Sequence, residues 1–546
     1  MLTAAVLIAS LGLQQPGPSP ADAVIVNARI WSDGLPGFAE CAAIDNGRFV
    51  HVGPRDERYI GVETKIIDAG GRIVIPGLID SHVHMLGGGM QLSQLQLRDA
   101  SGKEDFIKRV KDWSAKLAPG KWVLGGRYSV ESWDTPEQPT KEWIDGVTGD
   151  HPLFLSRMDG HSGLANSVAL KLAGITRDGP PDPAGGVIDR DPATREPTGI
   201  LRESAMALVT RHLPSITQQD QVAALKMAMV EALRHGITAV SDIPGINDLD
   251  AYAAIAPENY HVRFFLYPTA GDWVKAAEAA RAFAPRDGWL RINGFKTYMD
   301  GSLGSRTAYM REPFLNNEAG REGWHGLLRE GVDGGKLESN IRAAMDNGFQ
   351  PIAHAIGDEA NHLLIETYEK VFPDLRKARP RSEHAQHLLP EDIQRFGDMG
   401  VIASMQPYHK ADDGRYAEQY LGAQRCRSSY AFRSLLDAGC VVAFGSDWPV
   451  VSINPFLGVE AAVTGRTLDG KTWQTQESIT VGEALRCYTT RAAFAAFAEN
   501  EIGRIAPGYR ADFVILDHSP FDEGVDWKSI RPVAVFVDGV QRFAAD

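Results

Sequence analysis

The sequence contains few cysteines and no long hydrophobic run. Its four cysteines, Cys41, Cys426, Cys440 and Cys487, are widely spaced and form no C-x-x-C pair. This spacing argues against a disulfide framework and against a thiolate zinc site, so we expect buried, reduced thiols. No segment approaches the ~18 consecutive apolar residues of a membrane-spanning helix. We therefore expect a soluble mature protein with no membrane span.

The chain also lacks an excess of positive charge. Its 70 Asp and Glu against 56 Lys and Arg give a net charge of −14, and no block of like charge stands out. Nucleic acid is therefore not an expected partner, because its phosphates would be repelled. The expected partner is a small-molecule substrate, and association into a homo-oligomer stays open.

The N-terminus has the pattern of a secretory signal. Residues 1–13 are apolar and small, residues 14–20 are polar and rich in proline, and Ala21-Asp22-Ala23 has the form of an A-x-A cleavage site. We predict a signal peptide over residues 1–23, which would place the protein in the periplasm or outside the cell. The alternative is a disordered tail on a cytoplasmic protein.

Both ends of the remaining chain alternate in the manner of β-strands. Residues 24–75 contain short apolar stretches separated by Gly and Asp or Asn turns, and residues 501–546 have the same texture. Neither end has enough strands to be stable by itself. We predict that the two ends build one small β-sandwich.

Residues 76–500 alternate short apolar runs with helical patterns, which predicts a parallel α/β domain. Eight candidate strands make a closed (β/α)8 TIM-like barrel the natural architecture. These strands are expected at Ile73–Ile79, Gly236–Asp242, Val262–Tyr267, Ile292–Tyr298, Gln350–His354, Ser382–Ala385, Val401–Gln406 and Val441–Gly445.

One connection is too long for a barrel. Between the first and second candidate strands lie residues from about 85 to 235, whereas barrel loops are usually short. This segment has apolar runs of its own at Lys121–Leu124 and Pro152–Leu155. We predict an inserted α+β subdomain here.

Metal-binding side chains follow several of these strands. The first candidate strand leads into His82-Val83-His84, and alternate residues of a strand share one face. Two imidazoles at the carboxyl end of a barrel strand suit a metal ion. The ends of later strands add one polar residue each: Lys296, His354, His384 and Asp447.

Taken with longer motifs, these residues identify a family resemblance that covers nearly the whole chain. The motifs are Pro76 to His84, Met158 to His161, Lys296 to Arg306, His354 to Asp358, Glu383-His384, Gly445 to Val450 and Ile502 to Asp512. The sequence resembles the amidohydrolase superfamily of metal-dependent hydrolases. Within that superfamily it is similar to the large-insert branch that contains the N-substituted formamide deformylase-like proteins.

The resemblance implies two divalent metal ions. His82 and His84 would bind one ion with Asp447, and His354 and His384 would bind the other. Zinc suits these ligands, with manganese and iron as alternatives. Lys296 would bridge the two ions as a carbamate formed with carbon dioxide, which requires a neutral amine; burial lowers the pKa of a lysine and favours that form. An ordinary buried lysine paired with Asp300 is the alternative.

The resemblance also implies catalytic and substrate-binding roles. Asp447 would take a proton from the attacking water and pass it to the leaving group. His161, in the insert, would donate to the carbonyl oxygen or oxyanion, unless it is only a turn residue. Arg306 and His409 are expected to contact substrate, with a salt bridge as the alternative for Arg306.

The predicted function is hydrolysis of a non-peptide carbon–nitrogen bond in an amide, N-formyl or N-acyl compound, through a metal-activated bridging hydroxide. An esterase, lactonase or carbamate hydrolase would use the same residues. A non-catalytic binding protein with this fold is a third reading, and six pocket residues of metal-ligating type argue against it.

Overall fold

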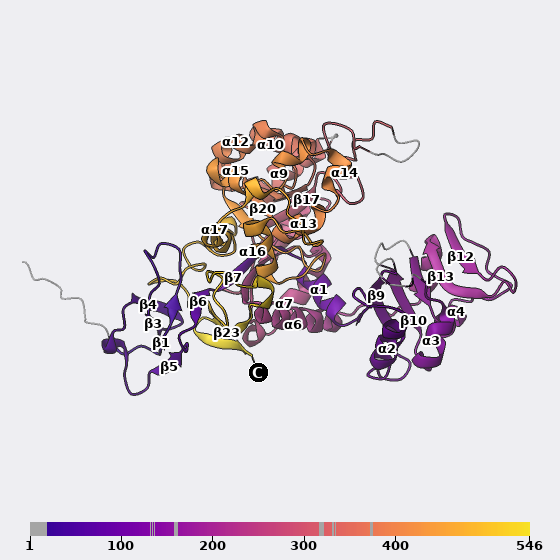
Figure 1. The fold of residues 1–546 in the computed structure, drawn as a ribbon, viewed down its shortest axis with the longest axis horizontal. Coiled ribbons are helices and arrows are strands. Elements are labelled where there is room, and N and C mark those ends of the chain that lie inside the picture. The colour runs from indigo at the N-terminus through magenta and orange to yellow at the C-terminus, as the bar shows by residue number, and fades with distance from the viewer. Residues whose placement is uncertain are drawn as a thin grey trace, which may run out of the picture. The chain divides into compact units, whose positions relative to one another are not determined.

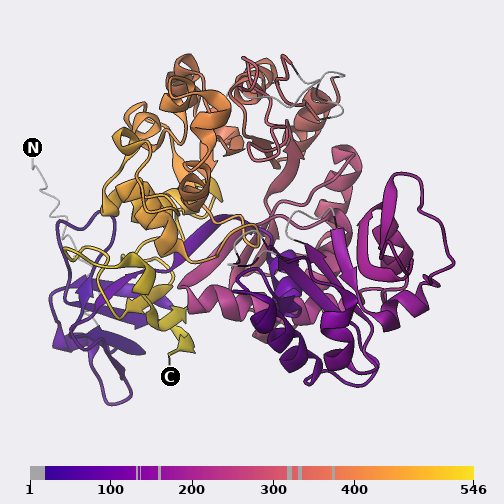
Figure 2. The ribbon, with the colours of Figure 1, turned by 45° about the vertical axis from the view of Figure 1, so that its right-hand side comes forward.

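The computed structural model describes residues 19–130, 133, 135, 137–157, 162–315, 322–329, 332, 335–371 and 375–545. The chain forms two compact units (Figures 1 and 2). The first comprises Met1–Val83, Glu231–Ile243 and Tyr260–Asp546, and the second comprises His84–Val230 and Pro244–Asn259. Among the described residues, no helix combines the length and apolarity needed to cross a membrane.

In the first unit, strands from both ends of the chain share one sheet, so that yellow β23 lies near the indigo N-terminal strands in Figure 1. Phe49, Phe513 and Phe536 belong to one apolar core, in which the last two rings stack with centroids 4.4 Å apart. One sheet has the order β4 (Arg48–Gly53), β3 (Cys41–Asp45), β1 (Ala23–Val26) and β5 (Lys65–Asp68); the other has the order β2 (Arg29–Ile30), β6 (Ile73–Pro76), β22 (Phe513–Leu516), β23 (Pro532–Val537) and β24 (Val540–Ala544).

The first unit also contains two sheets in which every pair of neighbouring strands is parallel. One has the order β16 (Leu290–Ile292), β15 (Arg263–Leu266), β14 (Ile237–Asp242) and β7 (Leu78–Val83); the other runs β17 (Gly294–Tyr298), β18 (Gln350–Ala355), β19 (Arg381–His384), β20 (Ile402–Met405) and β21 (Val442–Phe444). A parallel bridge joins Thr269, after β15, to Lys296 in β17. The amide of Asp447, after β21, donates to the His82 carbonyl in β7 at 2.7 Å.

Helices separate most of these parallel strands, as the alternating sequence pattern predicts. Sequence signals for their ends are visible: α12 stops at Gly400, which has a φ of 75°, and Thr480 and Glu483 form a capping box at the start of α17. The helices are α8 (Trp273–Ala282), α9 (Lys336–Asp346), α10 (Asp358–Val371), α11 (Leu375–Ala378), α12 (Pro390–Met399), α13 (Pro407–Asp413), α14 (Ala417–Leu421), α15 (Phe432–Asp437), α16 (Pro455–Thr464), α17 (Val481–Cys487) and α18 (Thr490–Ala495). The division between the units falls within α6 (Gln218–Arg234), after Val230.

The expected single strand over Ile73–Ile79 was wrong, because the chain divides there into β6 and β7 at Gly77. The Gly77 amide donates to the Asp512 carbonyl, and a Cβ at this position would lie only 2.2 Å from Thr238 Oγ1. Only glycine fits this close approach. One apolar run therefore supplies a strand to a terminal sheet and the next strand to a parallel sheet.

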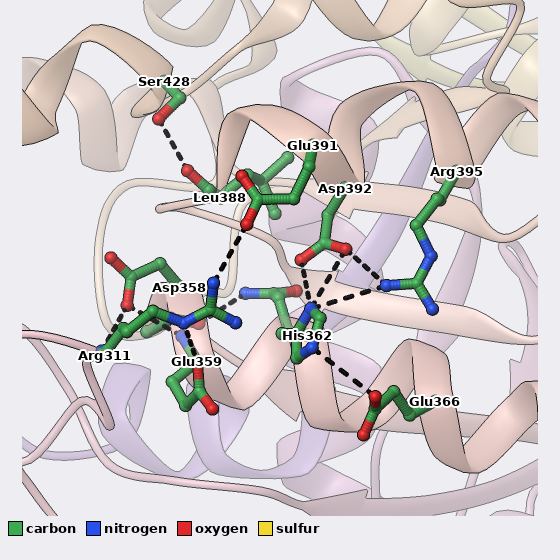
Figure 3. A network of polar contacts seen from close by, with 12 residues as sticks. Arg311, Asp358, Glu359, His362, Glu366, Leu388, Glu391, Asp392, Arg395 and Ser428 are labelled. Atoms are coloured by element: carbon green, nitrogen blue, oxygen red, sulfur yellow. Dashed lines mark hydrogen bonds and ion pairs between the residues drawn. The ribbon is translucent and has the colours of Figure 1, made fainter.

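Ion pairs link α10 and α12 to the segment that contains Arg311 (Figure 3). The Arg311 guanidinium contacts Glu359 at 2.6 Å and Glu391 at 2.9 Å. Deeper in the same network, the buried Asp392 carboxylate accepts hydrogen bonds from His362 and Arg395. The network thus contains both exposed carboxylates, such as Glu391, and buried ones, such as Asp392.

The second unit has a mixed six-stranded sheet with helices of its own (Figure 2). Its apolar core includes Phe106, Tyr128 and Trp133, with Phe106 edge-on to the other two rings. The sheet order is β12 (Gly186–Arg190), β13 (Pro197–Glu203), β11 (Ser162–Ala165), β10 (Leu153–Arg157), β9 (Val123–Tyr128) and β8 (Leu95–Gln96); the helices are α1 (Met85–Leu92), α2 (Lys103–Ser114), α3 (Lys141–Thr148), α4 (Ser167–Leu172), α5 (Ala207–Thr210) and α7 (Leu249–Ala253).

Candidate metal centre

His82 is held in one orientation by a buried carboxylate. Its Nδ1 donates to Glu383 in β19, and Arg381 Nε donates to the other oxygen of Glu383 at 2.7 Å. A proton on Nδ1 leaves the Nε2 lone pair of His82 available, and this atom lies 3.5 Å from Asp447 Oδ1. Burial lowers the pKa of His82 to about 4. The ring is therefore neutral near pH 7, which is the state that binds metal.

His84 follows β7 directly and caps the start of α1. His82, His84 and Asp447 each offer a ligand atom, and these atoms lie within 4.8 Å of one another. Two nitrogens and a carboxylate oxygen this close together are the usual protein ligands of a zinc ion.

Two buried contacts hold the Asp447 loop against β7. Asp447 has a φ of 59°, and its amide donates to the His82 carbonyl at 2.7 Å. The buried Asp80 carboxyl accepts from the amides of His82 at 3.1 Å and Ser446 at 3.0 Å. At Gly445 a Cβ would lie 2.5 Å from the His82 nitrogen, so a side chain here would push the two strands apart. These contacts position the carboxylate beside the imidazoles.

His354 and His384 extend the cluster from the neighbouring strands β18 and β19. Their ring centroids are 4.5 Å apart, and the His384 ring is 4.7 Å from that of His82. His354 Nε2 donates to the Gly301 carbonyl at 2.8 Å, and His384 Nδ1 donates to Gln406 Oε1 at 2.7 Å. Burial lowers the pKa of His354 to about 3 and that of His384 well below its usual value. Both rings therefore keep a free nitrogen lone pair at neutral pH.

Lys296 lies in β17 and is only 2% exposed. Its Nζ sits 4.7 Å from the centre of the Tyr298 ring, and within the described part of the chain it has no hydrogen-bond or ion-pair partner. Burial lowers the pKa of Lys296 to about 8. The expected alternative partner, Asp300, instead accepts from the amides of Tyr309, Ile356 and Gly357.

The predicted substrate residues fall in different places. His409 in α13 lies at the cluster, with its Nε2 3.9 Å from Asp447 Oδ2, and it forms a second potential ligand group with His384 and Asp447. Arg306 has a φ of 54° and its guanidinium packs over the Tyr420 ring at 4.5 Å. His161 lies outside the described residues.

Sequence reasoning assigned no role to Glu383, Arg381 and Gln406, which orient the histidines. Glu383 and His384 are adjacent, and a regular strand would turn them to opposite faces. His384 and Ala385 instead have φ values of 77° and 42°, so the strand ends at that point and the alternation fails. A glutamate directly before a candidate ligand, two residues after an arginine, was the available signal.

A family model and several known proteins match this chain over most of its length. A model of the amidohydrolase family matches residues 65–543. The chain is 38% identical to the Arabidopsis thaliana protein LONG AFTER FAR-RED 3, over 97% of this chain and 93% of that protein. It is 26% identical to the N-substituted formamide deformylase of Arthrobacter pascens, over 96% of this chain and 98% of that protein.

Solved structures share the same fold. The crystal structure of an uncharacterized metal-dependent hydrolase from Pyrococcus furiosus aligns with a TM-score of 0.72 and 25% identity. The alignment covers 92% of this chain and 100% of that one.

Proposed function

Because this chain belongs to the amidohydrolase family, whose members are hydrolases, we propose that it cleaves a non-peptide carbon–nitrogen bond of an amide, N-formyl or N-acyl compound. The observation that carries the proposal is the cluster of His82, His354 and His384, which burial keeps neutral beside the Asp447 carboxylate. The formamide deformylase that the chain resembles over nearly its whole length supports a carbon–nitrogen bond as the target.

The donor atoms fit two divalent ions. His82, His84 and Asp447 would hold one ion, and His354 and His384 the other. In His82, His354 and His384, one ring nitrogen donates a hydrogen bond to the protein, so the other ring nitrogen would bind the ion. Imidazole and carboxylate ligands favour zinc and also accept manganese or iron. Such ions, when bound, activate water at neutral pH and polarise a carbonyl oxygen.

Lys296 would complete the site as a carbamate. With a pKa of about 8, an appreciable fraction of its amine is neutral at physiological pH. The neutral Nζ attacks the carbon of carbon dioxide, forms an N–C bond and releases one proton to solvent. The product replaces a buried ammonium that forms no ion pair with the described residues with an anionic group carrying two oxygens, which suits a position between two cations.

The chain's own residues would handle the proton and the substrate. Asp447 accepts a proton from the attacking water and donates it to the departing nitrogen, which leaves as an amine. His409, 3.9 Å from Asp447, lies where it would contact substrate. His161 as an oxyanion donor and Arg306 as a substrate contact complete the proposed set.

We further propose that the two parallel sheets of the first unit close into one barrel. The Thr269–Lys296 bridge and the bond from Asp447 to His82 support closure at the two seams. In such a barrel, the residues of the metal centre would all lie at the carboxyl ends of the strands, where barrel enzymes carry their chemistry.

The test is a screen of the metal-loaded full chain against N-formyl amines, N-acyl amines, N-acyl amino acids and matched esters, with chromatographic detection of the released amine or alcohol. We expect turnover of at least one amide class and loss of it in His82→Ala. Faster turnover of esters or lactones would reassign the substrate class. Absence of bound metal by elemental analysis, with no turnover of any substrate, would indicate a binding protein instead.

A further inference from the structure

A cavity of about 390 Å³ lies in the first unit, at the opposite ends of the parallel strands from the histidines. Arg263 and Leu290 are the first residues of β15 and β16 and line this cavity, whereas the metal centre collects residues from the carboxyl ends. The remaining walls come from the loop over residues 285–289 and the segment over residues 497–502 that follows α18. Its size is within the range of small-molecule sites, ~300–1,000 Å³.

Arginines gather on the wall of this cavity although the chain as a whole is acidic. Four arginines line it, Arg263, Arg286, Arg291 and Arg510, against two acidic residues, Asp287 and Glu501, whereas the whole chain has a net charge of −14. Two of the arginines belong to ion pairs. Arg263 makes two bonds to Asp512 at 2.7 and 2.8 Å, and Arg510 contacts Glu501 at 2.6 Å. Asp538 also lies 2.7 Å from Arg263 and 3.2 Å from Arg510, so the charges of these two arginines are balanced by carboxylates.

Arg291 has no carboxylate partner within the described part of the chain. Its Nη2 donates to the carbonyls of Ala496 at 2.7 Å and Phe497 at 3.1 Å, and its buried Nε has no hydrogen-bond partner among the described residues. The guanidinium packs over the Phe265 ring at 4.7 Å. A largely buried guanidinium bound only to carbonyl oxygens is a costly arrangement that an anion would relieve.

Phe497, on the rim, supplies an independent observation. It has a φ of 54°, in the left-handed region that ends many helices and usually contains glycine. Its amide donates to the Phe494 carbonyl and that of Ala498 to the Ala493 carbonyl, so the residue lies directly after Ala496, the C-cap of α18. The ring is 40% exposed at the cavity. A bulky side chain in this conformation is strained, and such strain concentrates at ligand sites.

We propose that this cavity binds a small organic anion, namely a carboxylate carried on a planar apolar body. The Arg291 guanidinium supplies a positive charge for the carboxylate, and Trp289 and Phe497 line the cavity and provide aromatic surface for the apolar part. The proposal does not depend on the reaction at the metal centre, since the two sites share no residue.

The experiment is calorimetric titration of the metal-loaded full chain with benzoate and with benzamide, its neutral counterpart of similar shape. We expect saturable binding of benzoate with one site, and binding of benzamide weaker by about tenfold or more. Arg291→Gln should weaken benzoate binding by a similar factor. Arg376→Gln is the matched control and should bind as the parent does, because Arg376 also donates to a carbonyl, that of Asp398, but does not line the cavity.

Two further measurements separate this site from a structural role and from the metal centre. Phe497→Gly should weaken benzoate binding while its thermal unfolding midpoint is no lower than that of the parent, because glycine suits the backbone at that position. Benzoate binding should persist after the metal ions are removed by chelation. Equal affinity for benzamide, unchanged binding in both Arg291→Gln and Phe497→Gly, or loss of binding on chelation would overturn the proposal.

Discussion

Replacing Glu383 by glutamine tests the contacts that orient His82. The change keeps the size of the side chain but removes the negative charge between Arg381 and His82. The Arg381 and Glu383 side chains are both fully buried, with an N–O distance of 2.7 Å. Removing one partner of a buried ion pair leaves an uncompensated charge and costs about 3–5 kcal/mol of stability.

The pKa of Glu383 gives an independent magnitude. Burial alone would raise this pKa, but the charge of Arg381 and the hydrogen bond from His82 outweigh it and lower the pKa from 4.5 to about 2. A shift of this size corresponds to about 3 kcal/mol of stability. Because the pKa is lowered on folding, the contribution is fully present above the unfolded pKa of 4.5 and is lost as the pH falls through about 2. The stability gap between parent and variant should therefore narrow over that interval.

The assay is urea unfolding of metal-free parent and Glu383→Gln, at neutral pH and at several lower values, with metal content measured in parallel. We also expect metal affinity to fall by about 10–100-fold, because the partner that fixes the His82 tautomer is lost. Glu391→Gln is the control, since Glu391 is 58% exposed in its ion pair with Arg311 and should change stability by ~0.5 kcal/mol or less. The reasoning would be refuted if the free energy of unfolding of Glu383→Gln lay within about 1 kcal/mol of that of the parent and its metal content were unchanged.

Three further outcomes are expected. Removal of metal by chelation should abolish turnover and lower the thermal unfolding midpoint. The free energy of unfolding should fall by about 2.7 kcal/mol if the ion was present at ~100 times its Kd. An unchanged midpoint would contradict the proposed centre. Asp447→Asn should lower kcat by about 10²–10⁴-fold, with Asp437→Asn, on the surface of α15, as the control for expression and folding. Lys296→Met should abolish activity yet stabilise the metal-free protein by up to about 3 kcal/mol at pH 7, because the parent buries a charged amine. This gain in stability should shrink as the pH rises from 8 to 10.5, where the folded parent no longer carries that charge. Unfolding curves of parent and variant that superimpose at pH 7 would show that Lys296 is not destabilising.

The strand positions could be predicted because a parallel strand that is buried on both faces is recognised as one apolar run. The expected strand at Gly236–Asp242 is β14, at Ile237–Asp242, and that at Gln350–His354 is β18, at Gln350–Ala355. One exception is the expected strand Ile292–Tyr298, which divides at Asn293 between the end of β16 and β17. The other is at Gly77, where one apolar run serves two sheets. Its division depends on the close approach of Thr238, a residue distant in sequence, and no local pattern records it.

The sequence could predict the candidate-site residues that lie at or just beyond the carboxyl ends of strands. His82, His354, His384 and Asp447 were found in this way, and the structure brings them together. The residues that fix which ring nitrogen carries the proton, such as Glu383 and Gln406, were not predicted, because their role depends on contacts between different strands. Gln406 has no distinctive sequence signal, and only its 2.7 Å bond to His384 reveals that it selects a ring tautomer.

In the proposed centre, the charge state of Lys296 would control the binding of metal ions. Burial keeps the imidazoles of His82, His354 and His384 neutral, and the charge of Glu383 is balanced by Arg381. That leaves Asp447 as the negative ligand and the buried amine of Lys296 as the nearby group that repels cations when protonated. Conversion of the protonated amine to a carbamate would release two protons and change the charge of the side chain from +1 to −1. The same lysine that destabilises the empty fold would then favour two divalent ions, which links the stability and metal-binding measurements on Lys296→Met.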